Sequence, residues 1–432
     1  MTIVTHPSPR VIIVAENASY LFGGEAILPL HYFRHLREAG IEAWLVAHER
    51  NLEELKAANC ANEYSRIHFA KETKAMTLLW RITDKMPERI KALILESSLQ
   101  FMTQRSQRKI IRKLIPEVGA TVVHQPTPVS PKMPSLMFRL GAPVVIGPMN
   151  GGMRYPPAFR HRQSILERMA FKIARGASAL INRLIPGKRY ATALLVANER
   201  TRLALPPGLP RPIAQVSENG IDTEIWHANA NAETSKNQSD CAHFIFIGRL
   251  VALKAVDLLF HALSEIKKSS LATVKLEILG NGPELPALET LACELGIEDD
   301  VTFHGFKSQT ECALLLSKSD ALVLPSLHEC GGAVVLEAMA MGKAVIATNW
   351  GGPADYLDDT CGILIQPDGR QELIRGFADA ITKLANEPTL TDSLGRAGKK
   401  KVMSHFDWRI KIKNILAIYD QAIAMDNKQA DE

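Results

Sequence analysis

The chain has 432 residues, of which 46% are hydrophobic and 6% aromatic. This length exceeds what one hydrophobic core usually supports, so we expect two domains of roughly 200 residues each. No apolar run approaches the length of a transmembrane helix, and the run at residues 11–15 is too short for a signal peptide. The six cysteines lack Cys-x-x-Cys spacing, which favours reduced thiols in a cytosolic protein without a zinc site.

Charge is divided unevenly along the chain. Residues 1–211 contain 31 Lys and Arg against 15 Asp and Glu, a net charge of +16, whereas residues 212–432 contain 20 against 31, a net charge of −11. The basic first half predicts an anionic surface or substrate that meets this half alone. Nucleic acid is not the expected partner, because the sequence shows neither interleaved aromatic and basic residues nor a recognised nucleic-acid-binding module.

Strand and helix signals alternate along the chain, as a doubly wound α/β protein requires. Strands are predicted first at residues 11–15, 43–47, 121–124, 144–146 and 194–197. After a polar segment at 229–240, a second series follows at 243–247, 275–279, 301–304, 321–324 and 344–347. These series predict a first domain over residues 1–216 and a second over 217–407, followed by an amphipathic helix at 408–425. In open parallel sheets of this kind, ligands bind at the carboxyl ends of the strands.

The segment from Leu324 to Gly352 carries the most informative pattern. Glu329 and Glu337 flank a glycine turn that links a predicted strand to a predicted helix. The amides of Gly331, Gly332 and Ala333 would point at a phosphate there, and the helix dipole would favour its charge. Because carboxylates bind hydroxyl groups well, the arrangement predicts a sugar-nucleotide site, with one acid on the sugar and the other on the ribose.

Six segments in register resemble the motifs of retaining GT-B glycosyltransferases of the large family often called group 4, which carry a glycosyltransferase group 1 domain. They are Phe22–Glu25, Glu218–Asp222, Phe246–Leu250 with Lys254, Leu279–Glu284, Val301–Phe306 and the Leu324–Gly352 segment. The resemblance implies two doubly wound Rossmann-like domains facing a cleft, acceptor-binding first and donor-binding second. It also implies that the last helix packs back on the first domain.

The resemblance assigns roles to individual residues of the second domain. It implies that Arg249 and Lys254 clamp the donor diphosphate and that Glu329 is catalytic, as a hydroxyl binder more easily than as a nucleophile. Glu337, Gly248 and the glycines of the turn would bind the donor, as would Gly282 in the following loop. A solvated surface acid is the alternative interpretation of Glu337, although its apolar neighbours argue against that.

Fewer residues are assigned in the first domain. His124 resembles the histidine that lies against the transferred sugar, and its alternative role is that of a hydrogen-bonded residue at a strand end. Gly23 and Gly24 would let backbone amides approach the donor phosphate or the acceptor. Asn150 stands on the expected acceptor side, where many relatives carry a histidine.

The donor motif departs from the family at Cys330-Gly331-Gly332, where Gly-Phe-Gly is usual. A glycine replaces an aromatic residue that often packs beside the donor, so the sequence leaves the nucleotide and the sugar open. The sequence shows neither Asp-x-Asp with supporting ligands nor a His/Cys cluster, so we expect no metal and no cofactor other than the nucleotide-sugar cosubstrate.

The resemblance implies transfer of a hexose, with retention, from a UDP- or GDP-linked sugar to a glycan or a lipid-linked saccharide in cell-surface or exopolysaccharide synthesis. The alternatives are a sugar-nucleotide epimerase of the same architecture and a catalytically inactive sugar-nucleotide-binding relative. A dinucleotide dehydrogenase is disfavoured, because no Gly-x-Gly-x-x-Gly follows the first predicted strand.

Two basic amphipathic segments, Gln104–Ile115 and Ser164–Arg175, suit the surface of an anionic bilayer. Together with the charge of the first half, they predict a cytoplasmic protein attached peripherally to the inner face of the cell membrane, and they favour a lipid-linked acceptor. Core helices with a solvated basic face are the alternative interpretation of both segments.

Overall fold

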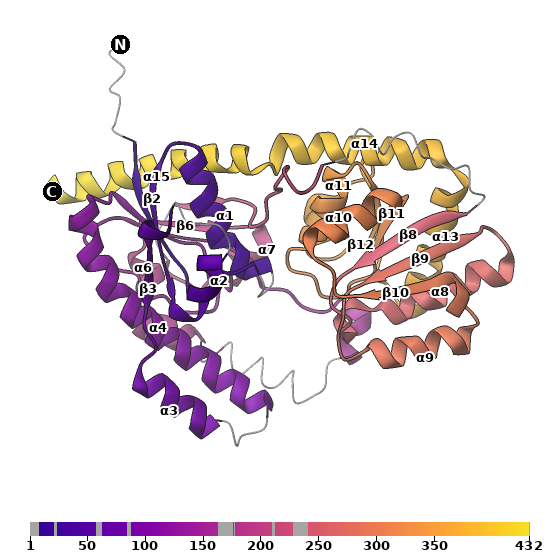
Figure 1. Ribbon diagram of the computed structural model, residues 1–432, viewed down its shortest axis with the longest axis horizontal. Helices are drawn as coiled ribbons and strands as arrows, with labels where there is room; N and C mark the ends of the chain where they lie inside the picture. Colours follow the sequence, from indigo (N-terminus) through magenta and orange to yellow (C-terminus); the bar gives the residue numbers. More distant parts are fainter. Residues whose placement is uncertain are drawn as a thin grey trace, which may run out of the picture. The chain divides into compact units, whose positions relative to one another are not determined.

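The computed structural model describes residues 8–20, 24–57, 63–83, 88–162, 176, 178–209, 212–227 and 241–431. The chain forms two compact units, the first comprising Met1–Gly152, Met169–Glu218 and Trp408–Glu432, the second Met153–Arg168 and Asn219–Asp407 (Figure 1). The assignment of Met153–Arg168 to the second unit differs from the predicted boundaries. Two contacts hold residues 153–162 to the second unit. Phe159 is buried in the core of that unit, and the Trp350 indole donates a hydrogen bond to the Arg154 carbonyl.

The first unit is built on a seven-stranded parallel sheet of order β3-β2-β1-β4-β5-β6-β7. Its strands are β1 (Arg10–Val14), β2 (Glu42–His48), β3 (Ile67–Ala70), β4 (Val122–Gln125), β5 (Val144–Met149), β6 (Ala193–Val196) and β7 (Ile213–Gln215). The five predicted strands are all present, and the short edge strands β3 and β7 are additional.

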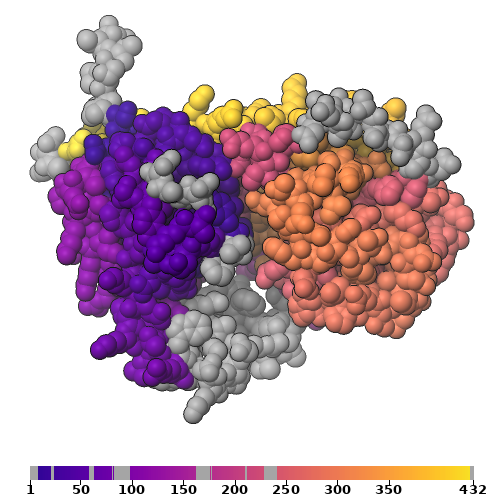
Figure 2. Space-filling view, in the orientation of Figure 1, coloured from indigo at the N-terminus to yellow at the C-terminus, as the bar shows by residue number. Residues whose placement is uncertain are grey.

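Helices cover both faces of this sheet. They include α1 (Gly24–Glu38), α2 (Leu52–Ala57), α3 (Lys74–Thr83), α4 (Glu88–Val118), α6 (Gly187–Tyr190), α7 (Glu199–Ala204) and α15 (Trp408–Asp431). Side chains alternate along β1, so Val11 and Ile13 join a core with α1 and α15, whereas Ile12 and Val14 join a core with α4. In both views α3 extends beyond the sheet at the lower edge of this unit (Figures 1 and 2).

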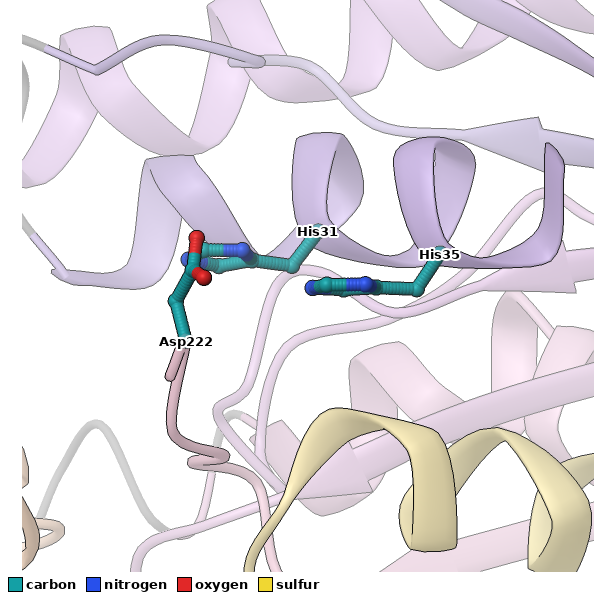
Figure 3. A group of neighbouring side chains, drawn as sticks. All are labelled: His31, His35 and Asp222. Atoms are coloured by element: carbon teal, nitrogen blue, oxygen red, sulfur yellow. The ribbon is translucent and has the colours of Figure 1, made fainter. Parts of the chain in front are cut away.

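The helix α15 packs in the core of the first unit. Its buried residues Trp408, Ile412, Ile415 and Tyr419 recur at helical spacing and join the core around α1. His31 and His35 lie one turn apart on α1 (Figure 3), and their rings stack on the Trp408 indole at centroid distances of 5.0 and 5.4 Å.

The second unit contains a six-stranded parallel sheet of order β10-β9-β8-β11-β12-β13. Its strands are β8 (Ala242–Ile247), β9 (Val274–Leu279), β10 (Val301–Gly305), β11 (Ala321–Leu324), β12 (Ala344–Thr348) and β13 (Ile363–Ile365). Its helices include α8 (Val256–Ser269), α9 (Leu285–Leu295), α10 (Gln309–Lys318), α11 (Ala333–Ala340), α12 (Gly352–Tyr356), α13 (Arg370–Asn386) and α14 (Pro388–His405).

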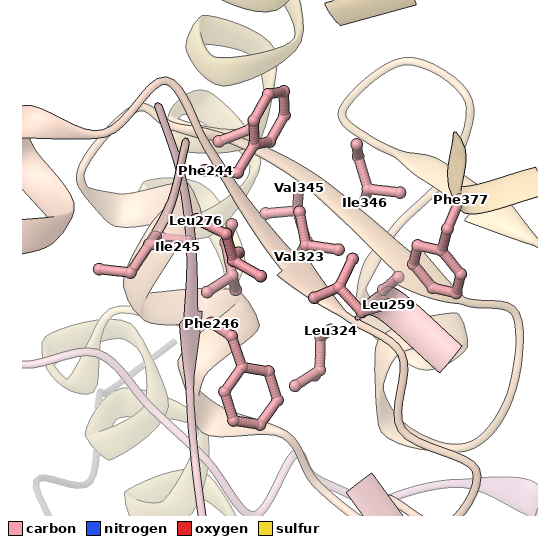
Figure 4. Packing of buried hydrophobic residues seen from close by; sticks show 14 of the residues in the cluster. Phe244, Ile245, Phe246, Leu259, Leu276, Val323, Leu324, Val345, Ile346 and Phe377 are labelled. Carbon is pink, nitrogen blue, oxygen red and sulfur yellow. The ribbon is translucent and has the colours of Figure 1, made fainter. Parts of the chain in front are cut away.

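The apolar strands of this sheet are buried on both faces, as Figure 4 shows for Phe244, Phe246, Leu324 and Val345. The strand order reverses between β8 and β11, which makes their carboxyl ends the position where a doubly wound sheet binds ligands. Within the described part of the chain, no helix has the length and apolar character needed to cross a bilayer.

Candidate donor site

Two glycine-rich loops pack together at the carboxyl ends of β8 and β9. The amide of Gly248 donates to the Leu279 carbonyl at 2.9 Å, and the amide of Leu250 donates to the Asn281 carbonyl at 2.9 Å. A side chain at Gly280 would clash with the Gly248 carbonyl, and one at Gly282 would clash with the Leu250 carbonyl. These glycines are therefore required by close backbone approach, and the visible role of Gly282 is to hold the loop that carries Arg249.

Arg249 and Lys254 follow β8 in this loop. The Lys254 ammonium forms an ion pair with Glu329, and the two side chains are only 13% and 15% exposed. The Arg249 side chain is exposed and has no hydrogen-bond or ion-pair partner among the residues that the structure describes. Of the two cations predicted to bind the diphosphate, Lys254 is therefore held by an ion pair, whereas the Arg249 side chain is not.

The loop after β11 holds Glu329 through several contacts. The Ser326 hydroxyl lies 3.4 Å from the Glu329 carboxylate, and the Leu327 amide donates to the Leu253 carbonyl at 2.9 Å. The Glu329 carbonyl accepts the Gly352 amide at 2.8 Å. The contact with Ser326 was not predicted from the sequence. Its position three residues before Glu329 could have indicated it.

The glycine turn opens α11 with free donors. Gly332 adopts a left-handed conformation (φ 72°) at the N-cap, with no side chain capping the helix. Within the described residues, the backbone amides of Gly331, Gly332, Ala333 and Val334 have no acceptor. A helix start with unpaired amides and a positive dipole end is suited to an anion such as phosphate.

Glu337 lies one turn into α11, half-buried among the fully buried Val335, Leu336, Ala338 and Met339. Removal from water raises the pKa of its carboxyl group from 4.5 to about 8. No partner for this carboxyl group is found in the described part of the chain. An acid in such surroundings is typical of a binding site more than of a solvated surface.

The side chain of His124 in β4 is held by protein groups on both sides. The ring is fully buried, with Nε2 2.6 Å from the Gly147 carbonyl and Nδ1 2.7 Å from the Tyr419 hydroxyl. Tyr32 packs edge-on against it at 4.7 Å, and burial lowers the pKa of the imidazole to about 4. Both ring nitrogens thus contact protein groups, as the alternative interpretation of a hydrogen-bonded histidine at a strand end expects. Contact of His124 with the transferred sugar stays a prediction.

Of the other residues predicted to be functional in the first unit, the structure describes Asn150 and Gly24. Asn150 is buried, and its side-chain oxygen lies 3.3 Å from the Asn198 amide nitrogen and 3.4 Å from the Thr201 hydroxyl, so it braces the loop after β5. Gly24 begins α1 with open space around it. Gly23 and the basic segment Ser164–Arg175 lie outside the described residues.

Comparison with known proteins shows the fold. The structure resembles sucrose-phosphate synthase of Thermosynechococcus elongatus (TM-score 0.67, 18% identity, 96% of this chain and 100% of that chain). It also resembles Anabaena HepE in complex with UDP (TM-score 0.66, 14% identity, 95% of this chain and 100% of that chain). The predicted GT-B fold, with two Rossmann-like domains, is thereby confirmed.

Part of the second unit also resembles a known family in sequence. Residues 229–401 match the model described as glycosyl transferases group 1. It is 28% identical to alpha-D-kanosaminyltransferase of Streptomyces kanamyceticus over 60% of this chain and 66% of that protein. It is 31% identical to the lipopolysaccharide core biosynthesis glycosyltransferase LpsD of Rhizobium meliloti over 43% of this chain and 51% of that protein. These matches thus span between half and two thirds of the relatives' own length.

Proposed function

We propose that the chain transfers a hexosyl group from a nucleoside diphosphate sugar to a hydroxyl group of a glycan or lipid-linked saccharide. The observation that carries the proposal is the Lys254–Glu329 ion pair beside the unpaired amides that open α11. Both arise at the switch point of the second sheet, where a diphosphate would meet a cation and a helix start together.

The described residues suggest how the donor would be held. The diphosphate would accept hydrogen bonds from the amides of Gly331 to Val334, with Lys254 held beside it by Glu329. The Arg249 side chain, which has no partner among the described residues, would close on the opposite side of the diphosphate. Glu337 would bind the ribose hydroxyls, and Glu329 would bind hydroxyls of the sugar.

In the reaction that we propose, the bond between the anomeric carbon and the diphosphate oxygen breaks while the acceptor oxygen forms a bond to that carbon. Negative charge grows on the leaving diphosphate, where Arg249, Lys254 and the helix amides would stabilise it more in the transition state than in the ground state. The acceptor proton would pass to the departing phosphate oxygen on the same face, which retains the anomeric configuration. These cations and amides would supply the charge stabilisation that a metal ion gives in other transferases.

The donor is proposed to be UDP- or GDP-linked, and UDP-sugars are the first to test because HepE was solved with UDP. Replacement of the usual aromatic residue by Gly331 leaves room beside the phosphate position. We place the reaction in cell-surface or exopolysaccharide synthesis, on the cytoplasmic side of the membrane.

The test combines donor binding with turnover. UDP- and GDP-sugars are screened by thermal shift, and release of the nucleoside diphosphate is then measured with and without a saccharide acceptor. Arg249→Ala should lower turnover by about a hundredfold while the protein stays folded, whereas the control Arg396→Ala, at an exposed position of α14, should not.

Full activity of Arg249→Ala would remove the proposed clamp. Conversion of the nucleotide sugar to its epimer without any acceptor would indicate the rival epimerase activity. Binding of the nucleotide sugar without either reaction would indicate an inactive relative.

A further inference from the structure

Residues 178–184 form a helical segment whose exposure is the reverse of that of an ordinary surface helix. Its inward positions are polar, with Ser178 and Asn182 both buried. Three large apolar side chains point outward, with Leu180 60%, Ile181 40% and Leu184 72% exposed, and Arg183 is exposed beside them. We refer to these three leucine and isoleucine side chains as the apolar face.

Hydrogen bonds fix this orientation. The Ser178 hydroxyl and the Asn182 side-chain amide both donate to the Lys132 carbonyl, at 2.7 and 2.8 Å. Asn182 also donates to the Ser178 carbonyl at 2.9 Å. Turning the apolar face inward would break these bonds and leave buried polar groups unpaired, which is costly. The exposed apolar side chains are therefore a stable property of the first unit.

The loop that receives these bonds also contacts basic residues of α4. Arg139 lies over the Tyr190 ring at 4.8 Å, and Phe138 stacks on the same ring at 5.9 Å. From α4, Arg108 lies over Phe138 at 4.3 Å, and Arg112 donates to the Arg139 carbonyl at 3.0 Å. Residues 132–139 thus connect the helical segment, Tyr190 and α4 through direct contacts.

The exposed part of α4 in this region is positively charged. Arg105, Lys109, Arg112 and Lys113 are exposed, and we refer to these four residues as the basic band. No Asp or Glu occurs from residue 97 to residue 116. Exposed Phe101 lies one turn before Arg105, so an apolar side chain accompanies the charges.

We propose that the apolar face and the basic band form a docking surface for an anionic lipid bilayer. Leu180, Ile181 and Leu184 enter the boundary between headgroups and acyl chains, and the basic band lies on the anionic headgroups. Exposed apolar side chains near a cluster of cations and an aromatic residue are the features that bind such a boundary. A lipid-linked acceptor would then be met at this surface, a consequence that rests on the proposed function, whereas bilayer binding does not.

Charge distinguishes this occupant from a second copy of the chain. Residues 1–211 carry a net charge of +16, so two such surfaces placed face to face would bring like charges together. An anionic bilayer complements the same charge and also accepts apolar side chains.

The experiment measures sedimentation with liposomes of phosphatidylglycerol and phosphatidylcholine, and with phosphatidylcholine alone, at low and high salt. Leu180→Ser, Ile181→Ser and Leu184→Ser combined should reduce partition to the anionic liposomes at least tenfold at both salt concentrations. Arg105→Ser, Lys109→Ser and Lys113→Ser combined should reduce it at low salt and remove most of its salt dependence. Neutral liposomes should bind the wild-type protein weakly.

Matched controls change similar side chains elsewhere. Leu203→Ser removes an apolar side chain that is 77% exposed, and Lys268→Ser, Lys318→Ser and Lys400→Ser combined remove three exposed cations of the second unit. Neither control should change partition by more than twofold. A nucleotide-binding measurement on every variant reports separately on the donor site, so failure of the proposed function would not be mistaken for failure of docking.

Insertion itself is tested with Leu184→Trp. Its fluorescence should shift to shorter wavelength on anionic liposomes and be quenched by brominated acyl chains. Unchanged partition of the three-serine variant, or no binding of wild-type protein to anionic liposomes at low salt, would overturn the proposal. A change from dimer to monomer in the three-serine variant, without liposome binding by the wild type, would assign the surface to a second copy.

Discussion

The substitution Glu337→Gln should make the free protein more stable near neutral pH while weakening its binding of nucleotide. The carboxyl group is half-buried among apolar side chains, and its pKa is raised from 4.5 to about 8 because ionisation in that environment is unfavourable. Glutamine has nearly the same shape and never ionises. The variant therefore removes the penalty for the charge and also removes the proposed acceptor of the ribose hydroxyls.

The size and sign of the effect follow from proton linkage. Between pH 4.5 and about 8 the folded protein holds a proton at Glu337 that the unfolded chain has lost. The free energy of unfolding should therefore fall as pH rises, by up to about 1.4 kcal/mol per pH unit. The stabilisation is complete below pH 4.5 and is lost above pH 8, and at most about 5 kcal/mol is involved over the whole interval.

The assay is thermal unfolding of the wild-type protein and Glu337→Gln at pH 5, 6, 7 and 8. The melting temperature of the variant, relative to wild type, should rise steadily across this series. The control Glu289→Gln, at an exposed position of α9, should follow the wild type throughout. Parallel curves for wild type and Glu337→Gln would refute the reasoning, because they would show that Glu337 ionises as readily in the folded protein as in the unfolded chain.

Nucleotide binding provides a second measurement on the same residue. If ribose hydroxyls bind the ionised carboxylate, nucleoside diphosphate should release close to one proton from the wild-type protein at pH 7. Calorimetry in two buffers of different ionisation enthalpy measures this release. Glu337→Gln should bind more weakly and should lose most of the proton release.

Other predictions concern the ion pair, the buried imidazole and the metal. Lys254→Met leaves Glu329 without its cation and should weaken nucleoside diphosphate binding more than tenfold by calorimetry, whereas Lys268→Met should not. His124→Phe removes hydrogen bonds to a carbonyl and to Tyr419, so unfolding should become easier by roughly 1–3 kcal/mol, and a pH–rate profile of the folded variant should keep its shape. Transfer should continue at an unchanged rate in excess chelator, and loss of activity that Mg²⁺ or Mn²⁺ restores would contradict the proposed use of protein cations.

The sequence allowed the strongly patterned parts of the fold to be predicted. Buried central strands such as β1 and β8 are largely apolar runs, so their type and order are visible without a structure. The missed strands β3, β7 and β13 have only four, three and three residues and lie at or near sheet edges. A run that short carries too little periodicity to be distinguished from a loop.

The candidate site was predictable where its residues are close in sequence. The turn at Gly331 and Gly332 belongs to one strand–helix junction, which a sequence pattern describes fully. The Lys254–Glu329 ion pair joins residues 75 positions apart, and the contact of His124 with Tyr419 joins residues 295 positions apart. Contacts of this kind depend on the topology of the sheet, and local patterns do not contain that information.

Packing of α15 in the first unit determines when that unit can fold during synthesis. Trp408, Ile415 and Tyr419 complete a core whose other members, including Val11 and Leu45, leave the ribosome first. Translation of the intervening segment Asn219–Asp407, the larger part of the second unit, takes roughly ten to forty seconds at ~5–20 residues per second. During that interval one apolar face of the first sheet lacks its final cover, so the nascent chain should be a chaperone client until α15 emerges, and deletion of α15 should prevent the first unit from folding.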